Sequence, residues 1–287
     1  MASMPAVSTE PRLAVSLVVN VEEGAEMSIL DGDKRPEAVD EMGLGLGEGL
    51  RNFGNESNYR YGLKEGFPRV ARLLEETGVP ATWTCAALAL ERSPQIAQFI
   101  AARGDEAASH GARWIPQHRM DEAAERAFLQ DARDRIAAAV GTAPAGHLSR
   151  YLHTERTREL LVQEGFSYHM DDYSGDEPFW DVTPSGPIVV VPYAIDTNDM
   201  KMWHDAGYTA RDWLDYLIDT FDELYAERRE GFRLMSVGTH LRIVGRPGRI
   251  GVLRRFIAHV QRHEGAYFTT RRDLAARFAA AVRPPVA

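Results

Sequence analysis

The chain has 287 residues, of which 44% are hydrophobic and 26% charged, so it is long enough to bury a large core. Its formal net charge of −9 argues against a nucleic-acid partner, because binding phosphates requires a basic surface. The single cysteine, Cys85, excludes an intrachain disulfide and a cysteine-based zinc cluster, and no apolar run approaches the ~20 residues of a membrane span.

The first half of the chain alternates apolar runs with segments of helical period. Residues 1–12 lack the basic start and the apolar centre of an export signal, so we predict a loose tail and a cytoplasmic protein. The predicted elements then follow in this order: a strand buried on both faces at 13–20, a Gly-rich and charged segment without a period at 24–60, a helix at 67–78, a strand at 80–85, a helix capped by Ser93 at 93–104, and a short run at 105–110. A segment as long as 24–60 usually closes a site or packs against a neighbouring subunit.

The second half continues the same alternation. Its predicted elements are a helix opened by Asp121 at 121–139, a helix at 154–165, strands at 166–170 and 187–193, a helix at 210–227, a strand at 233–240, and final elements at 252–263, 266–270 and 271–281. About seven strand–helix alternations without a linker favour one barrel-like α/β domain over 13–287 rather than two domains.

Polar side chains follow four of the predicted strands, at the point where each strand ends. In parallel α/β barrels these ends meet at one rim, where loops build the active site. Taken singly, an Asp after a strand is often only a turn former, and a lone buried His is more often structural than catalytic. The rim residues are Asn20, Glu22, Glu23, His110, Asp196, Asp199 and His240.

Glu22 and Glu23 are adjacent, and a strand alternates its side chains between two faces. One of the two carboxylates must therefore face the interior or the mouth of the barrel, where it needs a partner or a raised pKa. Such a carboxylate suits a general base, and the pattern leaves open which of the two it is.

Two other features have competing interpretations. His259 and His263 are four residues apart on one helix face, a spacing that can hold a metal ion, but the Arg residues around them favour an ordinary solvated helix face. Cys85 lies in an apolar run and is interpreted as a buried structural residue. The chain has neither a Gly-x-Ser-x-Gly elbow nor a nucleotide-binding glycine loop.

Five ordered motifs together resemble the polysaccharide deacetylase (NodB-homology) superfamily, and most closely its metal-independent branch of allantoinases and cyclic-imide hydrolases. The motifs are NVEEG at 20–24, ESNYRYG at 56–62, SHGARWIPQHRMDEA at 109–123, PYAIDTNDM at 192–200 and SVGTHLRIVGRPGR at 236–249. The resemblance implies a distorted (β/α)7 barrel of the NodB-homology type that hydrolyses an amide C–N bond.

The resemblance also implies how the metal ligands have changed. In metal-using deacetylases an Asp-Asp pair supplies a base and a ligand, and His-x-x-x-His supplies two further ligands. Here Glu22 and Glu23 occupy the Asp-Asp position, His110 matches the first histidine, and Trp114 replaces the second. Because an indole offers no lone pair and catalytic zinc normally has three protein ligands, we expect no metal and no other cofactor; zinc or another divalent cation is the alternative.

The expected substrate is a small cyclic amide, such as allantoin, a hydantoin-like ring or a cyclic imide. Glu22 or Glu23 is expected to take a proton from water, and His110 or His240 to stabilise the oxyanion or to protonate the leaving nitrogen. The expected substrate-binding residues are Asn20, Trp114 as a wall or as simple packing, Arg150 for a ureido arm, Asp196 and Asn198 for ring polar groups, and Arg242 (or Arg246) for the carboxylate of the product.

Two alternatives remain open. One is a metal-dependent carbohydrate N-deacetylase that keeps a cation through Glu23 and His110, and the other is a member of the superfamily that binds a ring without catalysis. The resemblance further implies a homo-oligomer, while the net charge and the lack of a long apolar run argue against a nucleic acid or a membrane as partner.

Overall fold

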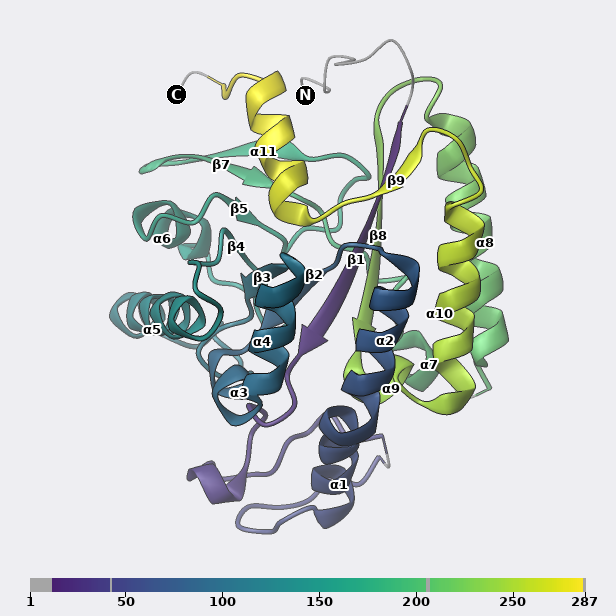
Figure 1. Ribbon diagram of the computed structural model, residues 1–287. Coiled ribbons are helices and arrows are strands. Elements are labelled where there is room, and N and C mark those ends of the chain that lie inside the picture. Colours follow the sequence, from purple (N-terminus) through teal and green to yellow (C-terminus); the bar gives the residue numbers. More distant parts are fainter. Residues whose placement is uncertain (1–11, 42, 205–206, 286–287) are drawn as a thin grey trace.

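The computed structural model describes residues 12–41, 43–204 and 207–285, so that of the predicted tail only Arg12 is included. These residues form one curled sheet with helices outside it (Figure 1). The strands are β1 (Leu13–Val21), β2 (Thr82–Cys85), β3 (Glu106–Ser109), β4 (Gly146–His147), β5 (Tyr168–His169), β6 (Phe179–Thr183), β7 (Gly186–Val190), β8 (Arg233–His240) and β9 (Ala266–Phe268).

The sheet confirms the predicted distorted barrel. Parallel strands run in the order β7-β5-β4-β3-β2-β1-β8, with β6 added antiparallel to β7 and the short β9 paired with the start of β1. Beyond β7, Asn198 forms a parallel bridge with Gly238 of β8, which brings the two sides of the curled sheet together. Carboxyl ends of the strands therefore converge on one rim, as expected for this architecture.

Strand β1 shows why its residues occupy the centre of the fold. All nine of its residues are buried, because both of its faces are covered. Its odd-numbered residues, such as Val15 and Val19, join the hydrophobic core beneath the helices, whereas Ala14 and Val18 join a second core inside the curl. This alternation sets which side chains point inward at the end of the strand.

The helices cover the outside of the sheet. In Figure 1, α8 and α10 lie side by side at one flank, α11 lies at the end where β1 begins, and α1 lies beyond the end where β1 finishes. They are α1 (Phe53–Tyr61), α2 (Phe67–Thr77), α3 (Ala87–Arg92), α4 (Pro94–Arg103), α5 (Glu122–Val140), α6 (Thr157–Gln163), α7 (Lys201–His204), α8 (Ala210–Glu227), α9 (Leu241–Val244), α10 (Pro247–Val260) and α11 (Arg271–Ala281), with a 3-10 turn η1 (Ile29–Asp31) and a π-helical turn η2 (Gly62–Gly66).

Local signals in the sequence account for several helix ends. The Oδ1 of Asp121 accepts a hydrogen bond from the N–H of Ala124, which confirms the predicted cap of α5. Ser93 precedes α4 as predicted, but its side chain makes no capping hydrogen bond, so that Pro94 at the first helical position is the main starting signal. The segment 24–60 is not wholly irregular, because it contains η1 and most of α1.

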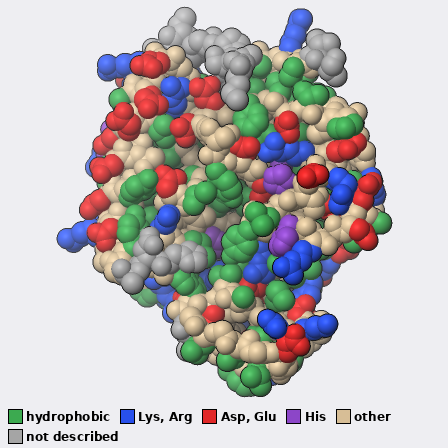
Figure 2. Space-filling model, turned by 180° about the vertical axis from the view of Figure 1, so that it is seen from behind, with side chains coloured by type: hydrophobic (Ala, Val, Ile, Leu, Met, Phe, Trp, Pro, Cys, Tyr) green, Lys and Arg blue, Asp and Glu red, His purple; other side chains and the backbone are tan. Residues whose placement is uncertain are grey.

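One face of the molecule has a cluster of apolar groups near its middle. On the face shown in Figure 2, hydrophobic side chains gather there with histidine and basic side chains beside them, whereas most acidic side chains lie nearer the periphery. Within the described part of the chain, none of the helices combines the length and the apolar character needed to cross a bilayer.

Candidate active site

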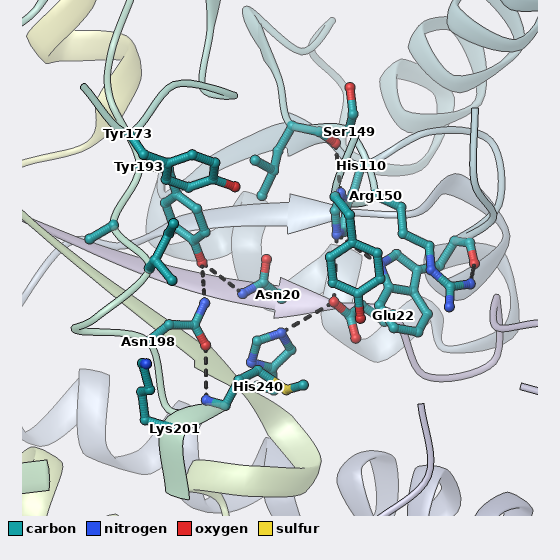
Figure 3. A pocket seen from close by; sticks show the side chains of 16 residues that line it. Asn20, Glu22, His110, Ser149, Arg150, Tyr173, Tyr193, Asn198, Lys201 and His240 are labelled. Carbon is teal, nitrogen blue, oxygen red and sulfur yellow. Dashed lines mark hydrogen bonds and ion pairs between the residues drawn. The ribbon is translucent and has the colours of Figure 1, made fainter. Parts of the chain in front are cut away.

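A cavity of about 450 Å³ opens at the carboxyl ends of the strands. Its size is typical of a site for a small molecule. Seven of the predicted site residues line it, and Figure 3 shows several of them pointing toward one another from β1, β8 and the loops that follow β3, β4 and β7. Its lining residues are Asn20, Glu22, His110, Trp114, Leu148, Ser149, Arg150, Tyr151, Tyr173, Tyr193, Ala194, Ile195, Asn198, Met200, Lys201 and His240.

The alternation of β1 distinguishes the two adjacent glutamates. Glu22 lines the cavity together with Asn20, on the inner face of the strand, whereas Glu23 does not line it. Glu23 is fully buried on the other side, where its Oε1 accepts a hydrogen bond from the N–H of Arg242 at 3.0 Å. A Cβ at Gly62 would lie 2.6 Å from that same oxygen, so the glycine makes room for Glu23. Burial raises the pKa of Glu23.

Glu22 is surrounded by cationic and polar groups. Its Oε2 accepts a hydrogen bond from Nη1 of Arg242 at 2.7 Å, and its Oε1 lies 3.3 Å from Nε2 of His240. Burial opposes ionisation, but His240 and Arg242 outweigh it and hold the pKa of Glu22 well below its usual range. Glu22 is therefore a carboxylate at neutral pH, held at the inner wall of the cavity.

His240 lies between two carboxylates. Its Nδ1 is 2.6 Å from Oδ1 of Asp199, and its Nε2 faces Glu22. Burial opposes the charged ring, but Glu22 and Asp199 outweigh it and raise the pKa of His240 to about 10. Asp199 is itself fixed, because its Oδ2 accepts hydrogen bonds from the N–H groups of His240 and Val244 at 2.8 and 3.1 Å. His240 is thus an imidazolium whose Nε2–H points at Glu22.

His110 has a different environment. Its Nδ1 lies 2.6 Å from the carbonyl oxygen of Leu148, which can only accept, so Nδ1 carries the hydrogen. The indole N–H of Trp114 donates to Nε2 of His110 at 3.0 Å. Both ring nitrogens are therefore engaged, and Nε2 also lies 3.5 Å from Oε1 of Glu22.

These contacts do not fit a resident divalent cation. The lone pair of His110 that would bind the ion already accepts the indole N–H, and Trp114 has no lone pair to add. A dication at Glu22 would also meet the positive charges of Arg242 and His240, which already pair with that carboxylate. Among the described residues, the cavity holds no group of three His, Cys, Asp or Glu side chains whose ligand atoms all lie within 4.8 Å of one another.

Tyr193 is a site residue that the sequence analysis missed. Its hydroxyl oxygen accepts hydrogen bonds from the side-chain amides of Asn20 and Asn198 at 3.1 and 3.2 Å. Because both lone pairs of that oxygen are used, its own hydrogen is left for the cavity. Tyr193 ends the predicted strand at 187–193, just as His110 and His240 end theirs, and this shared position was the signal that could have identified it.

One wall of the cavity is built by stacked groups. The guanidinium carbon of Arg150 lies 3.9 Å from the centre of the Trp114 ring, and its Nη2 and Nη1 pair with Glu37 at 2.5 and 2.9 Å. Tyr151 packs edge-on against the same indole, with ring centres 6.1 Å apart. Its φ of 63° is in the left-handed region, which a tyrosine rarely adopts. Glu37 comes from the 24–60 segment, so that segment does help to build the site.

Two predicted substrate contacts are not brought to the cavity. Asp196 is exposed, and its Oδ2 accepts a hydrogen bond from Tyr216, because Asn198 rather than Asp196 takes the inward position in this turn. Arg242 is fully buried beneath Glu22 and stacks 4.3 Å from the centre of the Tyr59 ring. Arg246, named as its alternative, bonds to Asn58 and does not line the cavity.

Comparison with known proteins places the chain among hydrolases of one family. Residues 58–169 match the family model described as polysaccharide deacetylase. A protein of Schizosaccharomyces pombe that is provisionally named a polysaccharide deacetylase is 32% identical over 94% of this chain and 91% of its own length. The peptidoglycan deacetylase of Helicobacter pylori is 25% identical over 74% of this chain and 83% of its own length.

Solved structures show the same relation. A structure of PuuE allantoinase superposes with a TM-score of 0.93 at 38% identity, over 100% of this chain and 96% of that one. A probable polysaccharide deacetylase from Pseudomonas aeruginosa PAO1 superposes with a TM-score of 0.92 at 37% identity, over 99% of this chain and 96% of its own.

Proposed function

Because this chain belongs to the polysaccharide deacetylase family, we propose that it hydrolyses an amide C–N bond within a small planar ring, such as a cyclic ureide or imide, without a metal ion. The likeness to PuuE allantoinase at 38% identity supports a ring substrate, whereas the named deacetylases among its relatives support amide hydrolysis more generally.

The single observation that carries this proposal is the hydrogen bond from the Trp114 indole to Nε2 of His110. It occupies the imidazole lone pair that a metal-using deacetylase would offer to its ion. Breaking it would leave a buried indole N–H without a partner, at a cost of about 1–3 kcal/mol before any ion is bound. Acid–base groups are then left to open the amide alone.

In the proposed first step, Glu22 takes a proton from a water molecule in the cavity as the water oxygen bonds to the carbonyl carbon. The geometry that supports this role is the ionised carboxylate on the inner face of β1. Tyr193 donates a hydrogen bond from its hydroxyl group to the carbonyl oxygen, where negative charge develops. Its two amide partners, Asn20 and Asn198, hold it in place for this contact.

In the second step the C–N bond breaks, and the imidazolium of His240 gives its Nε2 proton to the leaving nitrogen. Glu22 is now protonated and His240 neutral. Because Oε1 of Glu22 lies 3.3 Å from Nε2 of His240, the proton can pass directly between them. That transfer restores both groups, and the opened chain carries a carboxylic acid together with an amide, if the ring was an imide, or a ureido group, if it was a cyclic ureide.

The shape of the cavity supports a flat substrate rather than a polymer. Trp114 and Tyr151 form one wall beside Arg150, and Figure 3 shows Tyr173 across the cavity from Arg150. Aromatic faces of this kind pack well against a planar ring. Lys201 and Arg150 add positive charge to the lining, and Arg150 is already paired with Glu37. Lys201 is therefore placed to attract the carboxylate formed on ring opening.

The test is a substrate set of allantoin, hydantoin, succinimide and an N-acetylated sugar oligomer, each assayed with and without EDTA. We expect ring opening that is the same in EDTA, and no ring opening by a Glu22→Gln variant purified in parallel, which controls for contaminating hydrolases.

Two other outcomes would overturn the proposal. Deacetylation of the sugar that disappears in EDTA and returns with zinc would identify a metal-dependent deacetylase. A folded protein that is inert toward all four compounds but binds a ring would identify a non-catalytic member of the family.

A further inference from the structure

A second group of metal-binding side chains lies on the outer flank of the molecule, away from the cavity. Asp222 from α8 meets His259 of α10 and His263 just after it, and one potential ligand atom from each side chain lies within 4.8 Å of the other two. In the described part of the chain this is the one such group of three. The sequence showed only the two histidines and favoured a solvated helix face, because the third ligand comes from a different helix.

The hydrogen bonds indicate which atoms are available to an ion. Nδ1 of His263 lies 2.8 Å from the carbonyl oxygen of His259, so Nδ1 carries its hydrogen and Nε2 keeps its lone pair. Nε2 of His259 lies 2.7 Å from Oδ1 of Asp222. A metal ion would replace the hydrogen between these two atoms, as it does whenever a histidine becomes a ligand.

The two rings are held in place by aromatic packing. Phe221 is fully buried, and its ring centre lies 5.3 Å from that of His259 and 5.0 Å from that of His263. Tyr225 contacts His263 at 4.9 Å and donates its hydroxyl hydrogen to the carbonyl oxygen of Glu264. The imidazoles therefore lose little freedom when they bind an ion, and Asp222, whose side chain is 51% exposed, can adjust to it.

We propose that Asp222, His259 and His263 form a binding site for a divalent transition-metal ion, zinc being the natural case, that joins α8 to α10. Two imidazole nitrogens, one carboxylate oxygen and a water would complete a tetrahedral shell. Bond lengths of about 2.0–2.2 Å in such a shell place ligand atoms ~3.3 Å apart. Nε2 of His259 and Oδ1 of Asp222 lie 2.7 Å apart, and all three ligand atoms lie within 4.8 Å of one another, so one ion could reach all three after small adjustments of the side chains.

The experiment is a calorimetric titration of zinc chloride into EDTA-treated, dialysed protein. We expect one ion per chain, and at least about tenfold weaker binding in His263→Gln and in Asp222→Asn. The matched control is His118→Gln, because His118 is an exposed histidine outside the group. Cobalt in place of zinc should give the visible absorption of a tetrahedral ion in the wild type and lose it in His263→Gln.

Zinc should also raise the melting temperature of the wild type, and it should not raise that of His263→Gln, because binding to the folded chain alone stabilises it. The proposal is overturned if His263→Gln and the wild type bind zinc equally. It is also overturned if binding is lost in His110→Gln but kept in His263→Gln, which would place the ion in the cavity and contradict the metal-free reaction as well.

This site is independent of the proposed reaction. Ring opening by His263→Gln should equal that of the wild type with or without zinc. Consequently, zinc found in the purified protein would not by itself identify a metal-dependent deacetylase, and only the loss of activity on chelation would do so.

Discussion

Two buried histidines at strand ends of the same sheet have opposite charge states. His240, at the end of β8, lies between Glu22 and Asp199, which raise its pKa to about 10 against the effect of burial. His147, at the end of β4, is fully buried, and its nitrogens contact neutral groups: Ser109 Oγ at 3.1 Å, Gln117 Oε1 at 3.2 Å and Ser149 Oγ at 3.4 Å. Burial, reinforced by the neighbouring His169, lowers the pKa of His147 to about 3.

The charge of the partners, and not the depth of burial, therefore decides whether a buried histidine in this fold carries a proton that it can donate. A neutral ring between a hydroxyl and an amide can only hold neighbouring strands together. A ring between two carboxylates stores a proton that it can deliver. This difference supports our proposal that the reaction takes place in the Glu22–His240–Asp199 region and that the His147 region is structural.

The largest effect is expected for Glu22→Gln. The amide cannot take a proton from water, so kcat should fall by up to about 10⁴-fold. The matched control is Glu125→Gln, which changes a fully buried carboxylate that accepts a hydrogen bond from Gln117 in the other region. Steady-state ring-opening rates of both variants should show the control within about tenfold of the wild type. Equal losses in the two variants would remove the distinction between the regions.

His240→Gln should lower kcat by about 10²–10³-fold, because the leaving nitrogen loses its proton donor. The paired variant, His147→Gln, should lower the melting temperature and leave kcat nearly unchanged, because the groups it disturbs, Ser109, Gln117 and Ser149, take no part in the proposed proton transfers. Both quantities should be measured on the same preparations. A catalytic loss in His147→Gln as large as that in His240→Gln would show that the neutral region also takes part in the reaction.

Asp199→Asn should move the alkaline limb of kcat/KM to lower pH, with less than about a tenfold loss at neutral pH. In the wild type that limb is expected near the pKa of His240, about 10.

The same pKa affects stability. Because it is raised from 6.5, the contribution of His240 to the free energy of unfolding is complete below pH 6.5 and is lost as the pH rises through about 10. Asp199→Asn should shrink this contribution, as urea unfolding at several pH values would reveal. An unchanged limb would mean that another group delivers the proton.

The smallest effect is expected for Trp114→Phe. It removes the indole N–H that bonds to His110 and leaves the ring nitrogen without its donor, at a cost of about 1 kcal/mol in the free energy of unfolding. Loss of kcat/KM should stay within about tenfold, because no proton donor or acceptor of the reaction is removed. Urea denaturation and rate assays test these expectations. A larger rate loss, with unchanged stability, would make Trp114 part of the chemistry rather than of the wall.

The sequence predicted the rim because strand periodicity and polar residues are local signals. Asn20, Glu22, His110 and His240 all follow apolar runs, and parallel strands bring such ends together. The choice between Glu22 and Glu23 needed the register of β1, since its inner face is shared by Ala14 and Val18.

Contacts between residues far apart in the sequence could not be predicted from such local signals. Glu37 and Arg150 are 113 positions apart, and the segment carrying Glu37 has no period to place it. Tyr193 was interpreted only as the end of an apolar strand, because an aromatic ring occurs in a hydrophobic core as readily as in a binding site. Asp196 and Asn198 lie in one turn, where composition does not reveal which side chain points inward. The roles of Asp199 and Arg242 became visible only through their buried partners.

Replacing Arg150 would leave Glu37 as a buried carboxylate without its cationic partner. Both side chains are buried, with exposed fractions of 5% and 2%, and losing one partner of such a pair typically destabilises a protein by about 3–5 kcal/mol. A change of substrate preference through position 150 would therefore cost stability unless position 37 changed with it. Among related chains, these two positions are then expected to change together.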